Sequence, residues 1–165
     1  MMPLGHLGLP LLPFLFKGEI SWDVRLVVVG AVLPDLIDKP LGHLILPENN
    51  GRIIAHSIMF SAILLLSAVA WRPLMPVAYG TAVHQLLDGT FTEPQGALWP
   101  LMGGFRYTDY DVVRWLYAYT EPYVIAEEAA GAIVMISFMI IFGGFGWGNI
   151  RSLLARGRPE HASDN

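Results

Sequence analysis

The chain contains 165 residues, of which 54% are hydrophobic and only 15% are charged, and its formal net charge is −4. Soluble domains usually carry about 25% charged residues, so this composition favours a membrane protein. The acidic balance argues against a nucleic-acid partner, because nucleic-acid binding usually requires a basic surface. The sequence has no cysteine. Disulfides and thiolate ligands are therefore excluded, and any bound metal must use His and carboxylate side chains.

Five apolar segments follow one another along the chain, at roughly residues 4–16, 22–37, 53–71, 73–87 and 123–147. The first lacks a basic start, so we expect a membrane or re-entrant segment there rather than a cleaved signal peptide. Crossing the hydrocarbon takes about 20 helical residues, so we expect the third and fifth segments to span and the shorter ones to tilt or stop partway. We predict an all-α fold: one integral membrane helical bundle of about five segments over residues 1–150, and a polar cytoplasmic tail over residues 151–165.

The connector before the fifth segment, residues 89–122, mixes aromatic and charged side chains in a way that suits the headgroup region. Within it, residues 109–119 predict a short amphipathic helix at the membrane interface, and a loop folded over the end of the bundle is an equal alternative. With five crossings, six Lys and Arg residues fall on one side of the membrane and four on the other. The positive-inside rule then predicts a multi-pass cell-membrane protein with a cytoplasmic C-terminus.

Six potential metal ligands lie at the ends of the apolar segments, and these ends alternate along the chain. They stand at the start of the first segment, the end of the second, the start of the third and the end of the fourth: His6, Asp35, Asp38, His56, His84 and Asp88. Segments that cross in opposite directions bring these ends to one level, which is extracytoplasmic in the predicted orientation. This regular alternation favours a metal centre at a membrane surface, because polar residues scattered through a core would have no reason to follow it.

His84 and Asp88 are four residues apart, so on a helix they share one face and can bind one ion together. They stand in a mostly apolar stretch, where ionisable groups are costly and are usually functional. The structural alternative is a buried His–Asp hydrogen bond that ties two helices. Asp35 and Asp38 follow an apolar run and can converge on one cation, and the alternative for Asp38 is an ion pair with Lys39.

His56 precedes a long apolar run, where a lone histidine is more often a packing residue, but its depth matches that of Asp35 and His84. Arg52 stands one helical turn before His56. A guanidinium there suits a phosphoryl oxygen, and snorkelling to lipid headgroups is an equal alternative. His6 opens the first segment as a candidate ligand or as an N-terminal interface residue.

The remaining candidates are two histidines and two glutamates. His43, in a loop, is a second-tier ligand candidate, and His161 lies in the polar tail. Glu127 and Glu128 stand near the start of the fifth segment, on the metal side of a five-crossing bundle. One of them could complete a second metal site or act as a general base. Helical phase predicts that only one of the two faces inward.

The order of these motifs resembles the membrane-bound, metal-dependent hydrolase family, whose members are also described as LexA-binding hydrolases associated with the inner membrane. The resemblance covers about residues 5–102. It rests on His6, the stretch Leu33-Pro34-Asp35-Leu36-Ile37-Asp38, Arg52 to His56-Ser57, His84-x-x-x-Asp88 and the turn from Gly89 to Pro100. That family is in turn similar to the zinc-dependent phospholipase C superfamily, all-α enzymes that cleave phosphoesters at a multinuclear zinc site.

The resemblance implies that Asp35, His56, His84 and Asp88 form the central metal site, with His6 on a neighbouring metal. Two features depart from the pattern: Gly51 stands where the family often has a histidine, and a further His-x-x-x-Glu ligand set of the phospholipases is missing. We therefore expect one or two divalent ions rather than three, with zinc as the first candidate and manganese or magnesium as alternatives.

These observations predict an integral membrane hydrolase that cleaves a phosphoester of a lipid or lipid-linked substrate with a metal-activated water. Arg52 would bind phosphate, and Glu127 or Glu128 would act as base. The predicted partners are membrane lipid and this substrate, without nucleic acid, and the oligomeric state is left open. Two other classes compete: a non-catalytic membrane protein that binds metal structurally or binds a regulatory partner, and a small transporter. A structural site predicts a closed coordination shell, and a transporter prefers ligands nearer the bilayer midplane.

Overall fold

The structure is a computed structural model of the chain, and it describes residues 2–16, 21–46, 49–107, 112–142 and 147–157. These residues form helices and loops, with no β-strand among them, so the predicted all-α fold is confirmed. The α-helices are α1 (Pro3–Gly8), α2 (Val24–Pro40), α3 (Ile58–Ala70), α4 (Met75–Leu87), α5 (Pro94–Ala97), α6 (Val112–Ala118), α7 (Pro122–Ile141) and α8 (Trp147–Arg156). The other helical segments are the 3-10 helices η1 (Leu9–Leu15), η3 (Arg72–Leu74) and η4 (Thr90–Thr92) and the π-helix η2 (Leu41–Ile45).

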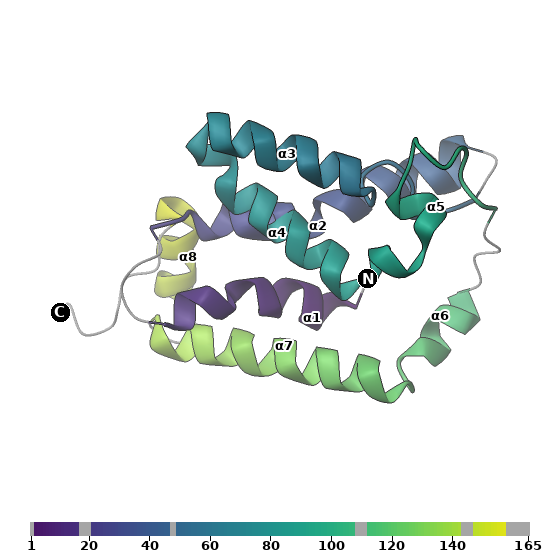
Figure 1. Cartoon of the computed structure of the whole chain (residues 1–165). Helices are drawn as coiled ribbons and strands as arrows, with labels where there is room; N and C mark the ends of the chain where they lie inside the picture. The colour runs from purple at the N-terminus through teal and green to yellow at the C-terminus, as the bar shows by residue number, and fades with distance from the viewer. Residues whose placement is uncertain (1, 17–20, 47–48, 108–111, 143–146, 158–165) are drawn as a thin grey trace.

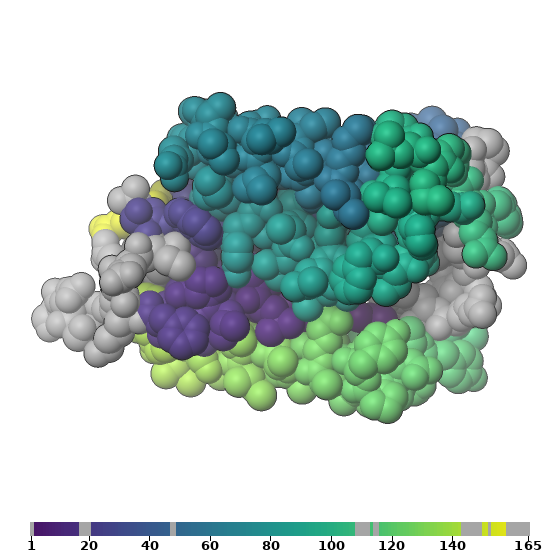
Figure 2. All heavy atoms as spheres, viewed as in Figure 1, coloured from purple at the N-terminus to yellow at the C-terminus, as the bar shows by residue number. Residues whose placement is uncertain are grey.

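The helices are stacked with α3 and α7 on opposite sides of the molecule and α4, α2 and α1 between them (Figure 1). The segment around α5 lies at one end, and the space-filling view shows it covering that end of the stack (Figure 2). The apolar core lies toward the other end, next to α8, and consists of Leu11, Phe14, Val24, Val27, Val134 and Phe138. Asp35 and Asp38 stand near the other end of α2 from the core residues Val24 and Val27. The apolar core and the polar cluster are therefore separated along the stack.

The close crossing of α2 and α4 depends on glycine and on a proline inside α2. A Cβ atom on Gly30 or Gly80 would collide with the backbone of the other helix, so the two backbones are in direct contact. Pro34 has no N–H to donate to the carbonyl of Gly30, and that carbonyl accepts instead from Thr81 Oγ1 at 3.1 Å. The break in the hydrogen-bond ladder of α2 thereby becomes an attachment point for α4.

A second close crossing joins α1 to α7. A Cβ atom on Gly8 would meet the carbonyl oxygen of Gly131, and one on Gly131 would meet Leu4 and Gly5 of α1. Small residues on both helices allow this approach, as in many helix pairs of membrane proteins. The crossing brings the side chains near the start of α7 within reach of His6.

Helix α3 begins at Ile58, so the uninterrupted segment predicted from residue 53 to residue 71 is wrong at its start. Ser57 is the N-cap, and its hydroxyl accepts a hydrogen bond from the backbone N–H of Phe60 at 3.1 Å. The residues before it donate their backbone N–H groups to the Asp38 carboxylate instead of continuing a helix. At 13 residues, α3 is shorter than the roughly 20 residues that a perpendicular crossing requires.

Among the described residues, one helix is long and apolar enough to cross a membrane, namely α7, with 20 residues and a mean hydropathy of 2.0. Pro3–Leu15 and Ile58–Ala70 are apolar but shorter. The five-crossing topology therefore stays a prediction. Exposed apolar side chains nevertheless lie along both outer helices: Ile58, Met59, Ile63, Leu65, Leu66 and Val69 of α3, and Tyr123, Ile125, Ile133, Ile136 and Ile140 of α7. Apolar surface of this extent is unusual for a soluble monomer.

The connector and the C-terminal segment are helical in part. Helix α6 lies within the predicted interfacial helix, of which residues 109–111 fall outside the described residues. Its position at a membrane surface stays a prediction. Helix α8 runs across the boundary predicted at residue 150, and the guanidinium of Arg25 donates to the carbonyl of Leu154 at 2.9 Å. The end of the predicted tail, residues 158–165 with His161, lies outside the described residues.

Candidate metal centre

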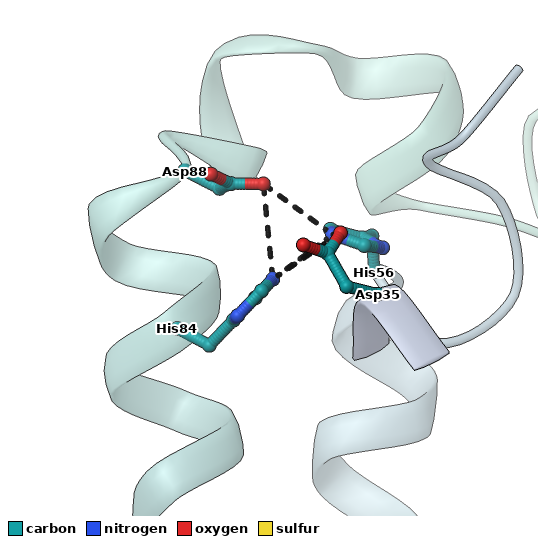
Figure 3. A group of neighbouring side chains, drawn as sticks. All are labelled: Asp35, His56, His84 and Asp88. Atoms are coloured by element: carbon teal, nitrogen blue, oxygen red, sulfur yellow. Dashed lines mark hydrogen bonds and ion pairs between the residues drawn. The ribbon is translucent and has the colours of Figure 1, made fainter. Parts of the chain in front are cut away.

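Four side chains from three parts of the chain converge on one another (Figure 3). Asp35 belongs to α2, His56 to the loop before α3, and His84 and Asp88 to the end of α4 and its C-cap. One donor atom of each lies within 4.8 Å of the donor atoms of the others. All four side chains are at least nine-tenths buried. The alternation of segment ends in the sequence predicts this convergence.

Five of the six distances between the donor atoms are close to those of a tetrahedral shell around one small ion. His56 Nε2 lies 3.2 Å from His84 Nε2, 3.7 Å from Asp35 Oδ1 and 3.4 Å from Asp88 Oδ2. His84 Nε2 lies 4.0 Å from Asp35 Oδ1 and 3.7 Å from Asp88 Oδ2. Zinc–ligand bonds of 2.0–2.2 Å place tetrahedral ligands about 3.3–3.6 Å apart. The observed separations bracket this range, so the donor set fits such an ion after small movements.

Both imidazoles turn their Nε2 atom toward the centre of the cluster. His84 Nδ1 lies 2.6 Å from the carbonyl oxygen of Ala31, which can only accept, so Nδ1 carries the proton. His56 Nδ1 lies 2.7 Å from Asp38 Oδ2 and donates to it. In the neutral rings, the two Nε2 lone pairs therefore face each other across 3.2 Å. A cation or an added proton between them relieves this repulsion, and hydrogen bonds of this kind on the outer nitrogen are typical of metal-bound histidines.

Asp38 lies behind His56 and outside the four-donor cluster. Its carboxylate is fully buried and accepts three backbone N–H groups of the loop 53–56 at 2.9–3.0 Å, as well as His56 Nδ1. These contacts fit a residue that positions His56, and the predicted ligand role of Asp38 stays a prediction. Lys39 does not pair with Asp38 as the structural alternative supposed, since its Nζ donates to Asp35 Oδ2 at 2.8 Å.

Asp88 and His56 stand outside the helices, and burial and neighbouring charged groups shift the pKa of each. Burial alone would raise the pKa of Asp88, but the imidazoles of His56 and His6 and the guanidinium of Arg52 hold this pKa far below its usual range. Burial alone would lower the pKa of His56, but Asp38 and Asp88 raise it above its ordinary value. The surroundings of Asp88 therefore keep this carboxylate charged, and it attracts positive charge.

Arg52 lies at the more exposed side of the cluster. Its Nη2 atom is 3.3 Å from Asp88 Oδ2, and its side chain is 37% exposed. Arg52 and His56 reach the same site although they belong to a loop and do not stand one turn apart on a helix, as the sequence suggested. A guanidinium in this position has further N–H donors available for a phosphoryl oxygen.

His6 extends the cluster toward α7. Its Nε2 atom lies 3.0 Å from Asp88 Oδ1, and its Nδ1 atom lies 3.1 Å from Glu127 Oε1. Neither His6 Nε2 nor Glu127 Oε1 has hydrogen-bond geometry in these contacts, although both atoms are buried. Glu128 Oε1 accepts from the backbone N–H of Gly5 at 2.8 Å. Both glutamates contact α1, because α1 lies close to α7, but of the two Glu127 reaches His6. The role of either glutamate in the site stays a prediction.

Gln85 is a residue of the site that the sequence analysis did not single out. Its Nε2 atom donates to the carbonyl of Ala55 at 2.8 Å, and its Oε1 atom accepts from Ser61 Oγ at 2.8 Å. Gln85 thereby fastens both the loop that carries His56 and the start of α3 to α4. The feature that could have identified Gln85 in the sequence is a polar amide inside the mostly apolar stretch around His84.

His43, the second-tier candidate, lies in the neighbouring loop. Its Nδ1 atom is 2.8 Å from Asn49 Oδ1. Its ring also occupies the space beside Gly51, where an added Cβ atom would come within 2.8 Å of His43 Nε2. The histidine that the resembling family often has at position 51 is thus replaced here by a glycine with an imidazole packed against it.

Over the residues that the structure describes, the fold is helical, with one helix suited to crossing a membrane and a buried His/Asp group that could hold a metal ion. Residues 1–151 match the family described as YdjM inner membrane protein, and the chain belongs to this family. No match was found to a curated protein or to a solved structure. The predicted membrane class is confirmed at the level of the family, and the resemblance to metal-dependent hydrolases and phospholipases C stays a prediction.

Proposed function

We propose that the protein is an integral membrane, metal-dependent hydrolase that cleaves a phosphoester of a lipid or a lipid-linked substrate. The observation that carries this proposal is the four-donor cluster with two imidazole Nε2 atoms 3.2 Å apart and a partly exposed arginine at its edge. The carboxylates of Asp35, Asp38 and Asp88 in this region face the side-chain cations of Lys39 and Arg52, and this balance favours a bound cation.

Asp35, His56, His84 and Asp88 would hold the ion, with Asp38 and Ala31 fixing the two rings. Zinc suits imidazole and carboxylate donors at this spacing, and manganese or magnesium are the alternatives. An ion bound there would lower the pKa of a water molecule to about 7 and would polarise a phosphoryl oxygen.

The residues around the ion would perform the remaining tasks. Arg52 would bind and orient the phosphoryl group from the exposed side of the cluster. Glu127 is better placed than Glu128 to hold a proton, because its Oε1 atom contacts His6 whereas Glu128 anchors the backbone of α1. His6 would either pass that proton toward Asp88 or ligate a second ion, in keeping with a site for one or two metals.

The proposed setting is a multi-pass protein with its C-terminus in the cytoplasm and the metal centre on the extracytoplasmic side. The exposed apolar faces of α3 and α7 would contact membrane lipid, which makes a lipid-borne substrate accessible without its leaving the bilayer.

The test is hydrolysis of phospholipid and isoprenoid-phosphate substrates in mixed micelles by the zinc-loaded, detergent-purified protein. We expect turnover that disappears on chelation, returns on adding zinc, and falls by about 100-fold or more in His84→Ala. Absence of turnover from every such substrate, in protein shown to hold stoichiometric metal, would contradict the hydrolase proposal.

One observation favours a second candidate function, a structural metal site. Four protein donors can fill a tetrahedral zinc shell completely, whereas catalytic zinc usually keeps one position open. A structural ion would stabilise the crossing of α2 and α4 without any chemistry. In that case chelation would lower the thermal unfolding temperature substantially, and the folded, loaded protein would show no hydrolysis.

A further inference from the structure

A pocket of about 670 Å³ lies beside the metal centre. This size lies within the range of small-molecule sites. It is lined by polar and charged side chains together with two aromatic ones, the lining residues including Arg52, Arg106, Glu93, Gln95, Phe105 and Tyr107. Two parts of the chain that are distant in sequence form the pocket: the loop before α3, and the stretch from η4 through α5 to residue 107.

Asn50 joins these two stretches. Its side chain is nine-tenths buried, its Nδ2 atom donates to the carbonyl of Arg106 at 2.9 Å, and its Oδ1 atom accepts from the backbone N–H of Arg52 at 2.9 Å. One amide thus fixes the backbones of both arginines to each other across 56 residues of sequence. The pocket is therefore a built feature of the fold rather than a gap between loose segments.

The charges on the pocket wall are available to a ligand. Arg106 and Glu93 are both exposed and have no ion-pair partner within the described part of the chain. Arg52 is shared, because it lines the pocket and its Nη2 atom also lies 3.3 Å from Asp88 Oδ2. An anionic group held by Arg52 in this pocket would consequently lie next to the four-donor cluster.

We infer that this pocket binds the phosphate-ester head of the substrate, with Arg52 and Arg106 binding the phosphoryl oxygens and Asn50 as the positioning residue that holds the two arginines. This inference deepens the proposed hydrolase function and rests on it for the identity of the substrate. Arginine suits the role because its planar donors match phosphate oxygens in pairs. Glu93 on the same wall disfavours a second phosphate group and suits the hydroxyl or amine groups of a head group.

The test measures binding rather than turnover. Zinc-loaded, full-length protein in detergent is titrated by calorimetry with glycerol 3-phosphate and, separately, with phosphatidic acid in mixed micelles. The two probes share the phosphate ester and differ in the acyl chains. Binding of both assigns recognition to the head group, and binding of phosphatidic acid alone adds a requirement for the chains. If neither binds at millimolar concentration, the inference is overturned.

Two variants of opposite charge provide the matched control. Arg106→Gln is expected to weaken binding of the probe about tenfold or more, through loss of a charge-assisted contact. Glu93→Gln, on the same wall, is expected to strengthen it about twofold to threefold because it removes a repulsive charge. Zinc content should be unchanged in both. Unchanged binding in Arg106→Gln, or equal weakening in the two variants, would overturn the inference.

The two proposals fail in distinguishable ways. If the probes bind with the expected sensitivity to Arg106→Gln and no lipid is hydrolysed, the pocket stands and the hydrolase proposal fails. If lipid is hydrolysed while Arg106→Gln changes neither Kd nor KM, the hydrolase proposal stands and the pocket assignment fails.

Discussion

The metal centre and the adjoining pocket share Arg52 and are built in opposite ways. In the centre, each imidazole has its outer nitrogen fixed by a second group, and the donor side chains are nearly excluded from solvent. In the pocket, Arg106 and Glu93 are exposed and Arg52 is partly exposed, and the side-chain amide of Asn50 fixes the backbone instead. The first arrangement suits a small ion that demands fixed distances. The second suits a larger ligand that approaches from outside.

This difference shows which side chains must be held in a fixed orientation. Second hydrogen bonds on metal-ligating histidines hold the ring and its tautomer in place, and their loss weakens metal affinity. Side chains that bind a phosphate ester need less restraint, because a planar guanidinium is already organised for its oxygens. Variants in the two regions should therefore separate metal binding from ligand binding.

The largest effect is expected from His84→Ala. Removing one donor leaves three and opens a cavity against the Ala31 carbonyl, so bound zinc should fall from stoichiometric to background levels in elemental analysis. His43→Ala is the matched control, since this imidazole contacts Asn49 in a neighbouring loop. Equal zinc content in His84→Ala and the wild type would refute the four-donor cluster.

Asp38→Asn should have the next largest effect on the metal. The four donors remain, but the buried charge that orients His56 and accepts the loop N–H groups is lost. The zinc Kd, measured by competition with a chromophoric chelator, should rise about 10-fold to 100-fold. A Kd equal to that of the wild type, in protein that keeps its helical circular dichroism, would show that Asp38 does not position His56.

Arg52→Gln should separate the two regions most clearly. Zinc content should stay unchanged, whereas kcat/KM for a lipid phosphoester should fall by about 100-fold, because a charge next to the phosphoryl group is lost. Arg52→Lys should recover part of this loss, since the charge returns without the planar pair of donors. Loss of zinc in Arg52→Gln would instead assign the arginine to the stability of the metal centre.

The smallest effect is expected from Ser57→Ala. The variant removes the N-cap of α3 and should lower the free energy of unfolding by about 1 kcal/mol, seen as a lower thermal midpoint in detergent. Ser67→Ala, inside the same helix and exposed, is the control and should stay near the wild type. If both variants unfold at the wild-type temperature, the cap does not stabilise the start of α3.

The sequence predicts the convergence of the cluster because segment ends follow from hydrophobic periodicity, and alternating ends must meet when helices are stacked antiparallel. The position of Asp38 could not be predicted, since it depends on a loop that donates its N–H groups to one carboxylate instead of extending α3. The pocket could not be predicted for a similar reason. Arg106 reaches it only through the fold of the connector and through the long-range hydrogen bond from the Asn50 side chain. Both glutamates of α7 contact α1 because of glycine packing, which helical phase alone does not reveal.

The central claim is that Asp35, His56, His84 and Asp88 form one metal site, and zinc-edge X-ray absorption on the purified, zinc-loaded wild type tests it most directly. We expect a first shell of two imidazole nitrogens and two carboxylate oxygens at about 2.0–2.2 Å. The zinc-edge signal should fall to background in His84→Ala, in which one of the four donors is missing. A protein that retains no zinc after loading, or a shell of oxygens without imidazole, would contradict the account.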